Sequence, residues 1–122
     1  ADPSPQVLVV IPARYGSTRF PGKPLALIHG KPMVQRVWER VQEAGLGGPV
    51  RVATEDERIV RAVEAFGGQA ALTRADHATG TDRVAEVASR FPDCEWVMNV
   101  QGDEPYVDPV HLRQAVAAIP QW

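Results

Sequence analysis

Short runs of β-branched residues alternate with helical hydrophobic patterns along this chain, and this alternation constrains the fold most. Residues 7–12 read VLVVIP, a continuous apolar run typical of a strand that is buried on both faces of a parallel sheet. Similar runs predict three more strands, at 50–54, 69–73 and 95–101. The helical patterns between and after these runs predict four helices: Pro32 to Gly45, 56–66, 82–91 and 110–119.

This order of elements predicts an α/β fold, a Rossmann-like three-layer sandwich with a mostly parallel sheet. In such sheets, ligands bind at the carboxyl ends of the strands. Three unusual loops, 12–24, 74–81 and 102–109, directly follow predicted strands. We therefore expect these loops to converge on one site.

The composition is that of a single soluble domain. The chain has 122 residues, of which 44% are hydrophobic, and a formal net charge of -2, which argues against a nucleic-acid or membrane-surface protein. One cysteine, Cys94, cannot form an intramolecular disulfide, and this favours the cytoplasm. No apolar run approaches the roughly 20 residues of a membrane span. We expect residues 1–6 to be a disordered leader or a cloning remnant, and 7–122 to be one folded unit.

The loop IPARYGSTRFPGKP, residues 11–24, concentrates positive charge after the first predicted strand. It is not a P-loop, because Ser17 stands where that motif needs its first glycine and Pro24 where it needs a hydroxyl. Three cations without an intervening acid instead suit a bound polyanion such as a triphosphate. The alternative is that Arg14, Arg19 and Lys23 are only solvated surface residues.

A second candidate site is the segment NVQGDEP, in which Asp103 follows the fourth predicted strand. One or two carboxylates together with phosphate oxygens are a common magnesium site. Taken alone, an aspartate that begins a turn beside Gly102 and Pro105 is the simpler interpretation.

The third segment is TRADHATGTDRVAEV, which leads into a predicted helix. Its amide groups could meet a ribose or a base, and either Thr79 or Thr81 is the expected N-cap. A ligand role and an ordinary loop position are equally good interpretations of His77.

Together these three segments closely resemble the cytidylyltransferases that activate 3-deoxy-manno-octulosonate, the CMP-Kdo synthetases. The likeness is carried by VVIPARYGSTRFPGKPLALIHGKPM, TRADHATGTDRVAEV and NVQGDEP, which extend from Val9 to about Pro105. It implies the fold of nucleotide-diphospho-sugar transferases and the Mg²⁺-dependent transfer of CMP from CTP to an acidic 3-deoxy sugar, for lipopolysaccharide biosynthesis. A sialate-type CMP-acylsugar synthetase and a nucleotide-binding module without catalysis are the alternatives.

The resemblance also implies roles for single residues. Arg14, Lys23 and Asp103 would be catalytic, and Asp103 would hold magnesium. The nucleotide would be bound by a larger set: Ala13, Arg14, Ser17, Arg19, Lys23, Arg74, Thr81 and Gln101. Members of this family form homodimers and continue well beyond the length of this chain. We therefore expect a nucleotide-binding fragment that is incomplete at its C-terminus, without a second metal ligand and most of the sugar pocket.

Overall fold

The computed structural model describes residues 7–16, 22–77 and 79–118. Two of the predicted site residues, Ser17 and Arg19, lie outside these ranges, as does the expected leader at 1–6. Within the described ranges, no helix is both long and apolar enough to cross a membrane.

A four-stranded parallel sheet forms the centre of the molecule, as the alternating pattern predicts. Its strands are β1 (Val7–Pro12), β4 (Val50–Thr54), β5 (Ala70–Leu72) and β6 (Trp96–Asn99), in the order β5-β4-β1-β6. Every residue of β1 is buried, because this strand lies between β4 and β6 and is covered on both faces. The continuous apolar run at 7–12 therefore marks an inner strand of the sheet.

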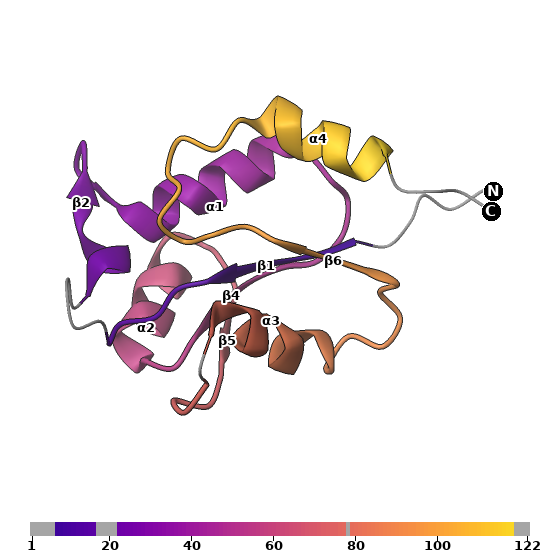
Figure 1. Cartoon of the computed structure of the whole chain (residues 1–122). Helices are drawn as coiled ribbons and strands as arrows, with labels where there is room; N and C mark the ends of the chain where they lie inside the picture. The colour runs from indigo at the N-terminus through magenta and orange to yellow at the C-terminus, as the bar shows by residue number, and fades with distance from the viewer. Residues whose placement is uncertain (1–6, 17–21, 78, 119–122) are drawn as a thin grey trace.

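Four helices cover the two faces of the sheet: α1 (Met33–Ala44), α2 (Glu57–Ala65), α3 (Gly80–Ala88) and α4 (Pro109–Ala117). In Figure 1, α1 and α4 lie above the sheet and α3 lies below it. The core on the α1 side contains residues of β1, β4, α1, α2 and α4, whereas α3 packs Val84 and Val87 against Leu8, Val10 and Ala53. This three-layer arrangement confirms the predicted fold class.

Helix α3 begins two residues earlier than the predicted span of 82–91 and ends earlier as well. The side-chain oxygen of Thr79 accepts a hydrogen bond from the amide of Asp82 at 3.1 Å, so Thr79 is the N-cap and Thr81 lies inside the first turn. After Ala88 the chain continues in tighter turns, in which the amide of Phe91 donates to the carbonyl of Ala88.

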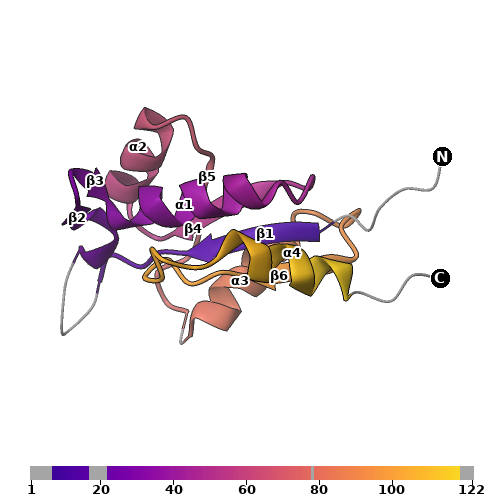
Figure 2. The same ribbon diagram turned by 90° about the horizontal axis from the view of Figure 1, so that it is seen from above.

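A small hairpin between β1 and α1 was not predicted. A short 3₁₀-helix, η1 (Lys23–Leu25), leads into β2 (Leu27–Ile28) and the antiparallel β3 (Lys31–Pro32). His29 and Gly30 have φ values of 51° and 83°, as a two-residue hairpin turn of type I′ requires. Arg36 of α1 donates hydrogen bonds to the carbonyls of Ile28 and His29, which holds the hairpin beside the start of α1 (Figure 2).

The strand order changes direction at β1. The chain passes from β1 to β4 and β5 on one side, and then returns to place β6 on the other side of β1. A crevice outside the carboxyl ends of the strands at such a point is the usual ligand position in open α/β sheets. The loops that follow β1 and β6 both begin there.

Candidate active site at the carboxyl ends of β1 and β6

The cationic loop at 11–24 and the segment NVQGDEP meet beyond the ends of β1 and β6. The Nζ atom of Lys23, in η1, lies 3.4 Å from Oδ2 of Asp103. Both side chains are about half exposed, at 45% for Lys23 and 53% for Asp103. A cation and a carboxylate that are accessible and adjacent can bind an anionic ligand and a metal ion side by side.

Gly102 explains how these segments come so close. Its amide donates to the carbonyl of Pro12 at 3.2 Å, which continues the contact between β6 and β1 beyond the strands. A Cβ atom on this residue would lie 2.7 Å from the same carbonyl oxygen, so only glycine fits without a shift of the backbone. The close approach places Asp103 beside the loop that follows β1.

The start of the cationic loop is anchored to the sheet. Ala13 is buried, and its amide donates to the carbonyl of Ala53 at 2.8 Å. Arg14 is exposed, and its Nε donates to the carbonyl of Gly16. The amide of Gly22 donates to the carbonyl of Tyr15 at 2.8 Å, so the two ends of the loop are tied together.

Glu55 lies at this loop, and sequence reasoning missed it. Its carboxylate accepts hydrogen bonds from the amides of Tyr15 and Gly16, at 2.9 and 3.2 Å. Burial raises the pKa of Glu55, but backbone hydrogen bonds, chiefly those from Tyr15 and Gly16, together with the charge of Arg83 bring it below its ordinary value. The residue comes directly after β4, and its position at a strand end is the only sequence signal that could have indicated it.

Arg74, in the loop after β5, is engaged with a neighbouring acid. Its Nη2 and Nε atoms lie 2.6 and 3.0 Å from the two carboxylate oxygens of Asp76, and both side chains are well exposed. This two-point hydrogen bonding lowers the pKa of Asp76 and raises that of Arg74. The guanidinium would have to share or exchange this partner to contact a nucleotide.

Two other predicted residues are accessible at the same edge of the sheet. Thr81 is exposed in the first turn of α3. Gln101 is exposed directly before Gly102, and its Nε2 donates to Oδ1 of Asn99 at 3.3 Å.

His77 has a structural partner. Its Nε2 lies 2.6 Å from Oε1 of Glu86, and the same oxygen accepts a hydrogen bond from the amide of Arg74 at 3.1 Å. Arg90 pairs with the other oxygen of Glu86. The hydrogen bond from the amide of Arg74 is the largest cause that lowers the pKa of Glu86, and the hydrogen bond from His77 is the next largest. This network ties the loop after β5 to α3, so the ordinary structural interpretation of His77 accounts for its contacts.

Arg83 of α3 is an unexpected buried cation, 2% exposed. Its Nη1 donates to Oγ1 of Thr73 and, at 3.1 Å, to the carbonyl of Arg74. It thus holds the end of β5 against α3. Its charge also contributes to the lowered pKa of Glu55, after the burial and backbone effects described above.

The described residues contain no cluster of three or more metal-ligating side chains. Asp103 therefore offers one carboxylate, which suits a cation whose other ligands are phosphate oxygens and water. A magnesium site at Asp103 stays a prediction.

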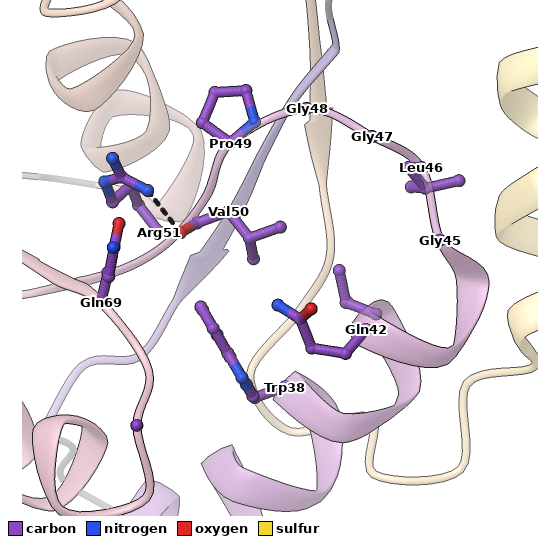
Figure 3. A pocket seen from close by; sticks show the side chains of 12 residues that line it. Trp38, Gln42, Gly45, Leu46, Gly47, Gly48, Pro49, Val50, Arg51 and Gln69 are labelled. Carbon is purple, nitrogen blue, oxygen red and sulfur yellow. Dashed lines mark hydrogen bonds between the residues drawn. The ribbon is translucent and has the colours of Figure 1, made fainter.

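A cavity of about 390 Å³ lies at the opposite end of the sheet (Figure 3). It is lined by residues of α1, including Trp38 and Gln42, by the loop into β4, and by Arg51 and Gln69. Arg51 donates to the carbonyl of Val50, as the dashed line shows, at 2.9 Å. None of the predicted site residues that the structure describes lines this cavity, so it is separate from the candidate active site.

Comparison with known proteins identifies the family of this chain. The family model described as cytidylyltransferase matches residues 8–121. A 3-deoxy-manno-octulosonate cytidylyltransferase of Geobacter metallireducens is 56% identical over 114 residues, and one of Myxococcus xanthus is 58% identical over 109 residues. These matches cover 93% and 89% of this chain, but 44% of each relative.

A solved structure of CMP:2-keto-3-deoxy-manno-octonic acid synthetase, complexed with CTP, is also similar. It is 47% identical, has a TM-score of 0.85, and matches 92% of this chain and 46% of its own. The identities and the TM-score confirm the resemblance to CMP-Kdo synthetases. The chain spans less than half the length of these relatives. A family match over nearly all of the described sheet, its helices and the loops at their ends makes this chain a member of the cytidylyltransferase family.

Proposed function

We propose that this chain is the nucleotide-binding portion of a CMP-Kdo synthetase, which transfers CMP from CTP to 3-deoxy-D-manno-octulosonate and releases pyrophosphate. The observation that carries this proposal is the pairing of Lys23 with Asp103 at the ends of β1 and β6. It brings a cation suited to phosphate next to a carboxylate suited to a metal ion, at the usual ligand position of an α/β sheet. The product serves lipopolysaccharide biosynthesis.

The cations of the loop after β1 neutralise the triphosphate. Attack on the α-phosphorus needs the reacting groups in line and needs compensation of the charge that develops on the leaving pyrophosphate. Lys23 and Arg14 supply this charge from the described part of the loop. Arg19 and Ser17 lie outside the described residues, and we assign them the same ligand.

Asp103 is the residue that would hold Mg²⁺. A single accessible carboxylate fits this ion, because phosphate oxygens and water complete its shell. Mg²⁺, when bound, neutralises phosphate charge and orients the triphosphate. Before the triphosphate binds, the ion pair with Asp103 holds Lys23 beyond the ends of β1 and β6. The triphosphate then competes with Asp103 for the ammonium group.

The remaining predicted residues would bind the nucleoside and the sugar. Ala13 presents its backbone at the end of β1, Thr81 presents a hydroxyl in the first turn of α3, and Arg74 offers a guanidinium from the loop after β5. Gln101 comes two residues before Asp103, and we assign it a role between the metal and the sugar. A homodimer and a cytoplasmic location of the full-length enzyme belong to the same proposal.

A nucleotide-binding module without catalysis is the second candidate. A turnover rate of the 122-residue chain comparable with that of a full-length enzyme would exclude this candidate.

The proposal is tested by measuring how much pyrophosphate the full-length enzyme releases from CTP in the presence of Mg²⁺ and 3-deoxy-D-manno-octulosonate. N-acetylneuraminate in place of the eight-carbon acid tests the sialate-type alternative. Binding of CTP to the 122-residue chain is measured in parallel by calorimetry. We expect CTP to bind and the eight-carbon acid to be the sugar used by the enzyme of full length. Absence of both CTP binding and pyrophosphate release would overturn the proposal.

A further inference from the structure

Glu55 follows the end of β4, and its carboxylate contacts the start of the cationic loop, which follows β1. In the register of β1 with β4, Pro12 is opposite Ala53, so Glu55 emerges beside Arg14 and Tyr15. Both of its carboxylate oxygens are used, one by the amide of Tyr15 and the other by the amide of Gly16.

Two consecutive amides that point at one carboxylate fix the direction of the backbone between them. Hydrogen bonds to a charged acceptor are stronger than those between neutral groups. Glu55 thereby sets the orientation of the peptide planes at Tyr15 and Gly16, directly after Arg14. An ordinary solvated surface carboxylate would not have both oxygens on backbone amides forty residues away.

The base of the loop is fixed by further contacts of Tyr15. Its carbonyl accepts the hydrogen bond from Gly22 at 2.8 Å, directly before Lys23. Its ring lies under the guanidinium of Arg58, 3.5 Å from the ring centroid. Arg58 is in turn paired with Asp56 at 2.7 Å. The amide, the carbonyl and the ring of Tyr15 are thus all held.

We propose that Glu55 is a positioning residue for triphosphate binding, acting through the amides of Tyr15 and Gly16 on the placement of Arg14 and Lys23. This inference rests on the proposed function of the loop. Glu55 does not itself contact the phosphates in this role, since a carboxylate would repel them. It holds the backbone from which both cations extend.

The test compares Glu55→Gln with Glu57→Gln, which removes the same charge from an exposed position two residues away. Calorimetry or NMR titration measures the binding of three probes: CTP, inorganic triphosphate and cytidine. A glutamine turns one acceptor oxygen into an amide donor that faces a backbone N–H. We therefore expect CTP and triphosphate to bind about tenfold more weakly to Glu55→Gln, with cytidine affinity unchanged. Glu57→Gln should match the wild type for all probes.

Hydrogen exchange provides a readout that is independent of any ligand. The amides of Tyr15 and Gly16 should exchange faster in Glu55→Gln than in the wild type and the control, with the other sheet amides unaffected. If Glu55→Gln does not fold, Glu55→Asp takes its place. It keeps the charge but is one methylene shorter, and it should weaken triphosphate binding and speed the same two amides.

The outcomes separate this inference from the proposed function. If the wild type binds neither CTP nor triphosphate, the proposed function is wrong and the inference falls with it. If the wild type binds CTP but the Glu55 variants bind triphosphate equally well, the inference alone is wrong. An equal loss of cytidine and triphosphate affinity would also overturn it, because a general structural defect would weaken both.

Discussion

The ammonium group of Lys23 lies 3.4 Å from the carboxylate of Asp103, across a sequence separation of 80 residues. The contact joins the loop after β1 to the loop after β6 at the point where the strand order changes direction. It is half exposed, so as a salt bridge it contributes only about 0–1 kcal/mol to stability. Its main consequence is that an ammonium group and a carboxylate lie together at the carboxyl ends of β1 and β6.

Replacing Lys23 by alanine should weaken CTP binding about tenfold, which corresponds to the roughly 1.5 kcal/mol of a charged hydrogen bond. The free energy of unfolding should change little, because the lost ion pair is exposed. Calorimetric titration with CTP measures the effect. Lys31→Ala is the control, since it removes a lysine that pairs with Glu39 in the hairpin region, and its CTP affinity should equal that of the wild type.

The variant Asp103→Asn should remove the part of CTP affinity that depends on Mg²⁺. In the wild type, added Mg²⁺ should tighten CTP binding, whereas the variant should show little response because an amide is a poor ligand for this ion. Titrations of CTP with Mg²⁺ and with EDTA measure the difference. Asp93→Asn, an exposed aspartate before β6, should keep the full Mg²⁺ response. An unchanged response in Asp103→Asn would show that another group holds the ion.

Gly102→Ala should destabilise the fold by about 1–3 kcal/mol, the usual range for an overpacked position. Its Cβ would lie 2.7 Å from the carbonyl oxygen of Pro12. Gly80→Ala is the matched control, because its nearest contact would be an ordinary 3.8 Å to the Pro12 ring. Urea denaturation measures both. Equal stability of the two variants would contradict the close contact at Gly102.

Thr79 and Thr81 should have separate roles. Thr79→Ala removes the N-cap of α3 and should cost about 1 kcal/mol of stability. Thr81→Ala should leave the free energy of unfolding within about 0.5 kcal/mol, as expected of an exposed position, but should weaken CTP binding. Thermal unfolding and CTP titration of both variants distinguish these roles. A larger stability loss in Thr81→Ala would place the cap two residues later.

Stability should decrease in acid partly through Glu86. Its pKa in the folded protein is below the ordinary value of 4.5, so the unfolded state binds the proton more readily. The stabilisation is fully present above about pH 4.5 and is lost as the pH falls through the lowered pKa. Glu86→Gln should therefore show a flatter decline of the free energy of unfolding between pH 5 and 3, measured by urea denaturation. The exposed Glu64→Gln should retain the slope of the wild type.

Sequence patterns predicted the four strands of the parallel sheet, the four helices that cover it and the edge of the sheet at which we expect the site. The apolar run at 7–12 and the helical spacing of the buried residues of α1 are local patterns, and each predicts which side chains are buried. The buried residues of α1 are Val34, Val37, Val41 and Ala44. Parallel strands bring their carboxyl ends to one edge, so the convergence of the loops after β1 and β6 followed from topology alone. The resemblance in these loops then indicated the family.

The contacts at that edge depend on tertiary packing. The strand order places Glu55 beside Tyr15 and Gly16, and the fit of Gly102 against Pro12 brings Asp103 to Lys23. The hairpin at His29 and the choice of Thr79 as N-cap depend on packing against α1 and on backbone geometry. No periodic pattern in the sequence predicts these contacts. Each joins residues whose distance is set by the neighbouring strands rather than by their spacing along the chain.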